Sequence, residues 1–299
     1  PLTDRMDYLA PLIYNCAYVM AVEKLMELEV TERCKIVRVI CMEMDRIFSH
    51  LLWLGTTAID VGAFTPFLYA FQERERIYGL HESFTGARIT TSATRIGGMM
   101  ADLPDGWVES LRDFLDTVPK TLDEIDSLLT TNAIYLGRTI DIGVISGEDA
   151  INHGLTGPNL RASGVPYDLR KDQPYYDYET YDFEVPVGEN GDCYDRYLCR
   201  IEEMKESVNI PMGAANNVEG QVFYDPENIS VPKTTTIEWI NYDDVMHTVT
   251  SSLDFGETFD SGIIDAGNTF RLDTANLELG QYEYMCIVHP WMIGTVTVE

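Results

Sequence analysis

The chain has 299 residues, long enough for two domains, and 45% of them are hydrophobic, as in an ordinary globular protein. Its 49 acidic against 21 basic residues give a net charge of −28, which argues against a nucleic-acid partner because phosphates would be repelled. No run of about 18 apolar residues is present, so no membrane-spanning helix is predicted. Residues 1–5 show no signal-peptide pattern.

Two long helices are predicted at the start of the chain. Apolar residues recur at helical spacing from about Tyr8 to about Leu28, and again over a longer stretch that ends where Gly62 and Pro66 break the pattern. Because only a short turn joins them, the two helices are expected to be antiparallel. Tyr8 and Asp60 are therefore expected to lie toward the same end of a helical bundle.

The helical pattern continues over roughly 66–84, 105–130 and 191–209, and these helices would complete the bundle with their apolar faces inward. Residues between about 146 and 190 form a loop-rich segment with many Tyr, Gly and Pro. After residue 211 the pattern changes, and the remaining segments read as strands.

Three histidines in the helical part are predicted to have structural roles. His50 lies among apolar residues and is predicted to be a satisfied core residue, whereas His81 and His153 are predicted to be surface or loop residues. The six cysteines form no Cys-x-x-Cys pair and no disulfide framework, which indicates reduced thiols in a reducing compartment.

Several motifs of the helical part match one family in type and order. They include Asp4-Arg5-Met6-Asp7-Tyr8 and the segments at 60–67, 71–75, 95–98, 155–164 and 191–196. With these motifs the chain, from its start to about residue 210, resembles the D subunit of proton-pumping NADH:quinone oxidoreductase, complex I. The resemblance implies an oxidoreductase and translocase subunit with a fold like the large subunit of hydrogenases.

The resemblance also implies roles for two residues. Tyr8 would hydrogen-bond a quinone carbonyl, and Asp60 would pair with a histidine that also binds the quinone headgroup. A phenol and a carboxylate-backed imidazole suit a reaction that needs two protons. The family's histidine lies in a His-Pro-Ser-Thr-His-Gly segment that this sequence does not contain.

Partners follow from the same resemblance. They are the other complex I subunits, including the neighbour that carries the terminal iron–sulfur cluster, and the quinone. No iron–sulfur cluster or nickel ion is expected in this chain, because the Cys-x-x-Cys pairs that hold nickel in related hydrogenases are missing from the sequence.

The strand-rich part holds a concentrated set of soft metal ligands. Cys286, His289 and Met292 fall within seven residues, and His247 lies on a separate predicted strand. A thiolate, two imidazoles and a weak axial thioether are the ligands of a mononuclear electron-transfer copper site. The alternative is a chance Cys-x-x-His pair beside a core methionine, with His247 an ordinary strand histidine. We expect one copper ion, one-electron transfer and a redox partner that docks at His289.

Four motifs of this part resemble the cupredoxins, closest to the amicyanin and halocyanin type. They lie at 239–241, 247–249, 259–262 and 286–292. The resemblance implies an all-β Greek-key sandwich with a type 1 copper ion. Strand patterns that alternate apolar and polar residues fit such a sandwich.

The predicted chain is therefore multidomain, with a helical domain over 1–210 that family comparison indicates is truncated at both ends, a linker over 211–217 and a cupredoxin domain over 218–299. The predicted locations conflict. The helical domain implies a peripheral position on the cytoplasmic or matrix face of an energy-converting membrane, whereas cupredoxins are usually extracytoplasmic.

Three interpretations of the whole chain stay open at this point. It is a fusion of two redox modules, a join of gene fragments in which only the copper half functions, or a non-catalytic assembly part of complex I. Copper binding and quinone-analogue binding would discriminate among them.

Overall fold

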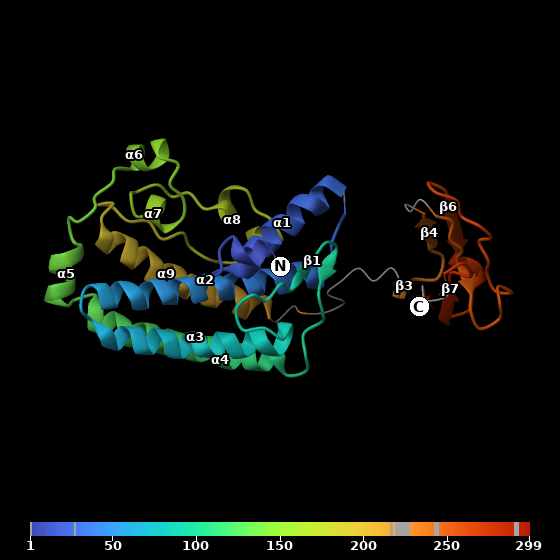
Figure 1. Ribbon diagram of the computed structural model, residues 1–299, viewed down its shortest axis with the longest axis horizontal. Coiled ribbons are helices and arrows are strands. Elements are labelled where there is room, and N and C mark those ends of the chain that lie inside the picture. Colours follow the sequence, from blue (N-terminus) through green and yellow to red (C-terminus); the bar gives the residue numbers. More distant parts are fainter. Residues whose placement is uncertain (1, 27, 216–217, 219–227, 242–244, 290–292) are drawn as a thin grey trace. The chain divides into compact units, whose positions relative to one another are not determined.

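A computed structural model describes residues 2–26, 28–215, 218, 228–241, 245–289 and 293–299. The chain divides into two compact units, Pro1–Tyr224 and Asp225–Glu299. The first is helical and the second is built from strands (Figure 1). Each unit has its own apolar core.

The helical unit is organised around α2 (Glu32–Asp60), which is preceded by the shorter α1 (Pro11–Met26). The side chain of Thr31 caps the start of α2 by accepting a hydrogen bond from the Cys34 amide at 3.2 Å. The helix ends where Gly62 adopts a φ of +93°, a conformation that favours glycine. Both ends of α2 are thus set by local sequence.

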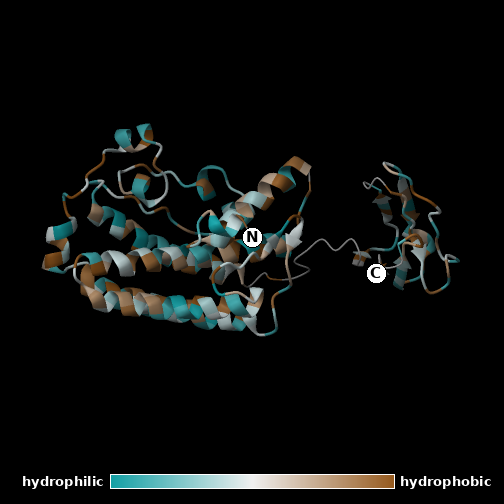
Figure 2. Cartoon of the chain, viewed as in Figure 1, coloured by the Kyte–Doolittle hydropathy of each residue, from teal (hydrophilic) through white to brown (hydrophobic). Residues whose placement is uncertain are grey.

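Three further long helices pack around α2. α2 contacts α3 (Phe64–Thr85) and α9 (Cys193–Ala214), and α4 (Trp107–Leu129) contacts both of these helices (Figure 1). Each long helix carries both apolar and polar residues (Figure 2), and the apolar ones, such as Phe48 and Leu51 of α2, form the shared core. The smaller elements are α5 (Ala133–Thr139), α6 (Gly147–Asn152), α7 (Pro158–Arg161), α8 (Leu169–Asp172), the 3-10 turns η1 (Thr3–Arg5) and η2 (Tyr178–Thr180), and the paired strands β1 (Thr94–Arg95) and β2 (Gly98–Met99).

The loop-rich segment is attached to the bundle through buried ion pairs. Glu43 of α2 is fully buried and accepts hydrogen bonds from Arg170 at 3.1 Å, from the Tyr178 hydroxyl at 2.6 Å and from the Ser207 hydroxyl at 2.6 Å. These partners come from the loop-rich segment and from α9. One carboxylate therefore joins three parts of the chain that are distant in sequence.

A second pair of this kind joins α7 to α9. Glu203 accepts hydrogen bonds from Arg161 at 2.7 Å and is 2.8 Å from the His50 ring. Although burial opposes ionisation, the neighbouring cationic and hydrogen-bonding groups lower the pKa of Glu43, Glu203 and Asp168 to about 2.

These shifts predict acid sensitivity of the helical unit. A carboxylate with a lower pKa in the folded state contributes stability that is complete above its unfolded pKa and is lost as the pH falls toward the folded pKa. The free energy of unfolding is therefore expected to fall between about pH 4.5 and about pH 2, the unfolded and folded pKa values of Glu43 and Glu203. Urea unfolding followed by helical circular dichroism across this range tests it, and a stability that does not change with pH would contradict it.

The C-terminal unit consists of two sheets. One has the strand order β3 (Asn228–Val231), β8 (Ile293–Val298), β7 (Gly280–Met285) and β5 (Thr250–Ser251), with β3 parallel to β8 and the other pairs antiparallel. The second sheet has two antiparallel strands, β4 (Thr236–Ile240) and β6 (Thr269–Asp273). Ile237 and Leu272 of the smaller sheet share one core cluster with Tyr284 and Val296 of the larger sheet.

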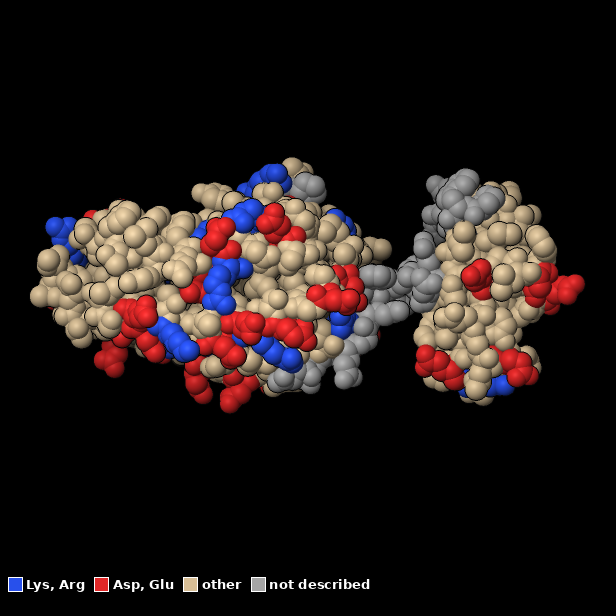
Figure 3. Space-filling view, turned by 90° about the horizontal axis from the view of Figure 1, so that it is seen from below, with Lys and Arg blue, Asp and Glu red and all other residues tan. Residues whose placement is uncertain are grey.

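Surface charge is mixed on the helical unit. On the face in Figure 3, Lys and Arg side chains lie among Asp and Glu side chains, so the described residues of this face form no large basic patch. None of the helices in the described part of the chain combines the length and the hydrophobicity that a membrane span requires.

Candidate functional site

In the C-terminal unit, three predicted metal ligands converge. His247 is held by a β-bridge to Ile264, with hydrogen bonds of 3.1 and 2.8 Å between their backbones. Cys286 directly follows β7, and the amide of His289 donates to the Cys286 carbonyl at 3.2 Å, which forms a tight turn. A strand end and a bridged segment thus bring residues 39 positions apart to one place.

The three ligand atoms form a nearly equilateral triangle. Cys286 Sγ lies 3.7 Å from the Nδ1 atoms of both His247 and His289, and these two nitrogens are 3.3 Å apart. Ion-to-ligand distances of about 2.0–2.1 Å for nitrogen and about 2.3 Å for sulfur, as at zinc, would give N–N and N–S edges of about 3.3–3.7 Å. The triangle therefore fits one metal ion. The fourth predicted ligand, Met292, lies outside the described residues.

The surroundings of Cys286 lower the pKa of its thiol. Its side chain is nearly buried, with 3% exposed, and the Thr248 amide donates to Sγ at 3.3 Å. Although burial opposes the thiolate, the hydrogen bonds from Thr248, His247 and His289 lower the pKa of Cys286 to about 6. A thiolate is the form that binds a soft metal ion.

The surrounding residues hold this arrangement in place. The side-chain amide of Asn241 donates to the carbonyls of Val245 and Ile264, at 2.7 and 2.8 Å, which fixes the segments on both sides of His247. The hydroxyl of Thr248 accepts from the Ile287 amide at 2.8 Å and so joins this segment to the loop after Cys286. The sequence does not disclose these bonds, because each joins a side chain to a backbone group, and every residue carries such a group.

The two predicted quinone residues lie just before α1 and at the end of α2. The Leu12 amide at the start of α1 donates to Asp45 of α2 at 2.6 Å. Asp60 is exposed and lies about 22 Å further along α2, at a rise of about 1.5 Å per residue. Tyr8 is 63% exposed and four residues before Leu12.

The start of α1 therefore lies beside the middle of α2 and not beside its Asp60 end, and a shared position of Tyr8 and Asp60 stays a prediction. The position of the α1 start follows from length, because α1 has 16 residues and α2 has 29, so the antiparallel pair overlaps only along the first half of α2. The predicted start of the first helix near Tyr8 is too early, since α1 begins at Pro11.

The other histidines follow the prediction in two of three cases. His50 is buried and bonded to Glu203, as expected of a satisfied core residue, and His153 is exposed at the end of α6. The predicted surface or loop position of His81 is wrong, because His81 is 2% exposed on the inner side of α3, 3.4 Å from Asp45. The residue that follows His81 is the charged Glu82, so the local sequence does not indicate that His81 is buried.

The helical unit combines a set of sequence motifs with a bundle whose loop-rich segment is held by buried ion pairs. Residues 60–262 match the family described as the respiratory-chain NADH dehydrogenase 49 Kd subunit. The chain belongs to this family. The match ends before Cys286 and His289.

Individual relatives agree. The chain is 55% identical to the D subunit of the NADH-quinone oxidoreductase of Methylacidiphilum infernorum over 238 residues, which is 79% of this chain and 57% of that protein. It is 52% identical to the D subunit of Geotalea uraniireducens over 78% of this chain and 60% of the relative. With the D subunit of Geobacter metallireducens the identity is 50%, again over 78% and 60%. The chain thus spans little more than half the length of these relatives.

Proposed function

We propose that this chain is an electron-transfer protein whose helical unit forms part of the quinone site of an NADH:quinone oxidoreductase. The family membership of the chain supports this function. Tyr8 would donate a hydrogen bond to a quinone carbonyl, and Asp60 would orient a histidine of the same site. In this role the helical unit would sit beside the subunit with the terminal iron–sulfur cluster, at the periphery of the membrane.

Quinone-analogue binding tests this proposal. Tyr8→Phe removes only the hydroxyl and is expected to weaken binding of a quinone analogue by about 2–13-fold, since one hydrogen bond contributes about 1 ± 0.5 kcal/mol. Tyr18→Phe is the matched control, because Tyr18 is also exposed on this part of the molecule, on α1. Equal affinity of the two variants would contradict the role of Tyr8.

We also propose that the C-terminal unit is a cupredoxin-like sandwich that holds one copper ion through His247, Cys286 and His289, with Met292 as a fourth, distant ligand. The triangle of ligand atoms carries this proposal, and the two sheets around a single core support the fold. A bound copper ion would supply one-electron oxidation and reduction.

The residues of the chain would give this site its properties. Burial of Cys286 keeps water from its sulfur, and the Thr248 amide stabilises the thiolate. His289 is half-buried, and it borders a surface hollow that is otherwise lined by Val245, Met246, Asp265, Ala266 and Val288. An apolar rim of this kind beside one ligand is a suitable docking surface for a redox partner.

Copper titration distinguishes this site from a zinc site with the same ligands. One equivalent of Cu(II) is expected to give an intense visible charge-transfer band from the thiolate, which zinc does not give because its d shell is full. Binding of zinc but not of copper would contradict the electron-transfer role.

A non-catalytic assembly role is the second candidate for the helical unit. It is favoured by the contact of Leu12, four residues after Tyr8, with the middle of α2 rather than with its Asp60 end. In this case the helical unit would only dock other complex I subunits, and neither residue would affect the binding of quinone analogues.

A further inference from the structure

Asp45 of α2 and His81 of α3 face each other in the interior of the helical unit. Asp45 is fully buried and His81 is 2% exposed, and Asp45 Oδ1 lies 3.4 Å from His81 Nε2. Within the part of the chain that the structure describes, neither atom has a well-aligned hydrogen-bond partner, and the polar group that acts on the His81 ring is the backbone of Arg88. Two buried polar groups without hydrogen bonds lower the stability of the folded chain. A proton shared between them would remove this cost because it forms a hydrogen bond.

The environment favours a single proton in this pair. Burial raises the pKa of Asp45 well above its ordinary value, against the opposing effect of the Leu12 and Ile13 amides. Burial lowers the pKa of His81 to about 4, although a backbone group of Arg88 opposes this shift. Both shifts favour the uncharged forms, so the carboxylic acid can donate its proton toward a neutral imidazole.

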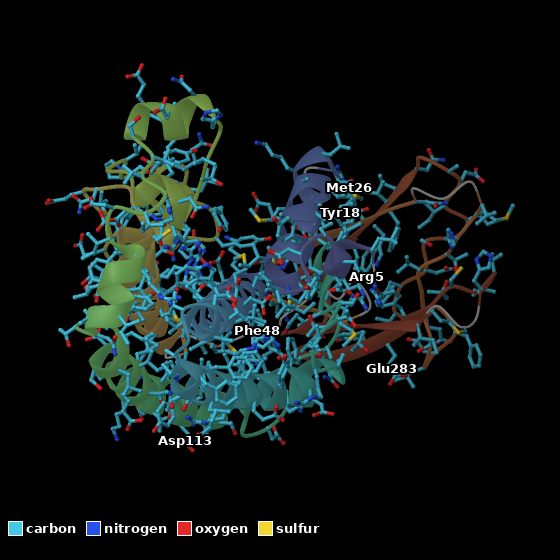
Figure 4. The ribbon with its side chains drawn as sticks, turned by 60° about the vertical axis from the view of Figure 1, so that its left-hand side comes forward. Arg5, Tyr18, Met26, Phe48, Asp113 and Glu283 are labelled. Atoms are coloured by element: carbon cyan, nitrogen blue, oxygen red, sulfur yellow. The ribbon has the colours of Figure 1, made fainter. Side chains whose placement is uncertain are left out.

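Other charged and titratable groups act on Asp45, and Arg74 among them opposes the rise in its pKa. Arg74 of α3 lies over the Phe48 ring, with its Cζ 3.6 Å from the ring centroid, and donates to the Phe48 carbonyl and the Tyr78 hydroxyl. Figure 4 shows Phe48 in the densely packed interior. The remaining groups that interact electrostatically with Asp45 are a carboxylate before α1 and two thiols whose pKa burial raises: Asp7, Cys16 and Cys41.

The pair is connected to the segment that carries Tyr8. Asp45 Oδ2 accepts from the Leu12 amide at 2.6 Å, at the start of α1. On the other side of Tyr8, the buried Asp4 accepts from the Asn15 side chain and from the Ser92 amide at 3.1 Å. Tyr8 therefore lies on a short segment between two anchored points.

We propose that Asp45 and His81 are a positioning pair that shares one proton, fixes the start of α1 and thereby places the Tyr8 hydroxyl. This role rests on the proposed quinone site. When the pair loses its proton, a buried carboxylate remains at Asp45, and opening of the segment that covers it becomes easier because the open state hydrates the charge. Because the fold raises the pKa of Asp45, the start of α1 should be held less tightly as the pH rises.

Infrared spectroscopy of the full chain tests the shared proton directly. At neutral pH we expect a carboxylic-acid C=O band that is lost in Asp45→Asn and retained in Asp116→Asn, a control at an exposed carboxylate of α4. In His81→Leu the band should shift to higher frequency rather than disappear, because the acid loses its acceptor. Absence of any band that depends on Asp45 would overturn the proposal.

Hydrogen exchange tests the effect on the start of α1. Protection of the Leu12 and Ile13 amides is expected to decrease as the pH rises in the wild-type chain, after correction for intrinsic exchange. Asp45→Asn keeps an acceptor but cannot ionise, so it should abolish this decrease. Asp45→Ala should accelerate exchange by about tenfold or more. An Asp45→Asn variant with the wild-type pH profile would contradict the proposal, even if Asp45→Ala unfolds.

Quinone-analogue binding separates this proposal from the proposed function. The wild-type affinity is expected to vary with pH, and that of Asp45→Asn is expected to be constant over the same range. If the wild-type chain binds no analogue, the proposed quinone site fails, while the infrared and exchange results still decide the proton-sharing pair. If the analogue binds but the affinities of the two proteins vary equally with pH, only the link from the pair to Tyr8 fails.

Discussion

Glu43→Ala is expected to lower the free energy of unfolding of the helical unit by about 3 kcal/mol, the low end of the range for breaking a buried ion pair. Arg170 is 2% exposed and donates to both Glu43 oxygens at 3.1 Å, and in the variant it would keep only its second carboxylate, Asp168, at 2.7 Å. The Tyr178 and Ser207 hydroxyls would also lose their acceptor. Urea unfolding at neutral pH measures the change.

The matched control is Glu75→Ala. Glu75 pairs with Arg88 at 2.6 Å, but both side chains are largely exposed, so this change is expected to cost much less than Glu43→Ala. Equal stability of the two variants would show that the buried network around Glu43 does not hold the helical unit together.

Cys286→Ser is expected to abolish the visible charge-transfer band of the copper-loaded chain, because the band requires the thiolate. It should also weaken copper binding by more than about 100-fold, beyond the ~10–100-fold cost of changes outside the ligand shell. The control is Cys193→Ser, since Cys193 is a half-buried thiol at the start of α9 in the other unit. The helical circular dichroism should not change in either variant.

An outcome in which Cys286→Ser retains the band would show that another group supplies the sulfur ligand. Such a result would leave the convergence of His247 and His289 without a function.

The helices can be predicted from the sequence because their signals are local. Apolar spacing locates α2, α3, α4 and α9, and the break at Gly62 marks the end of α2 correctly. The start of α1 cannot be placed in this way, because the Leu12 amide there is satisfied by Asp45, 33 residues further along the chain. A bond of that sequence separation leaves no pattern in either segment.

The buried charges show the same limit. Glu43 is a charged residue of α2, and a charged residue is ordinarily expected at the surface. Its partners Arg170, Tyr178 and Ser207 are 127 to 164 residues away in the sequence. Only the fold reveals that this glutamate is interior. The wrong prediction for His81 has the same cause, because its burial depends on the packing of α3 against α2.

The metal site is the opposite case. His247, Cys286 and His289 can be predicted as one set, because thiolate with imidazole is a chemically restricted combination. The sequence does not show how His247 is held beside the other two residues, which depends on its bridge to Ile264.

The most direct measurement is an X-ray absorption spectrum at the copper edge of the full chain loaded with one equivalent of copper. We expect a coordination shell with one short sulfur and two imidazole nitrogens, and loss of the short sulfur in Cys286→Ser. A shell of oxygen and nitrogen ligands without sulfur, or one unchanged in that variant, would contradict the claim that Cys286, His247 and His289 bind one ion.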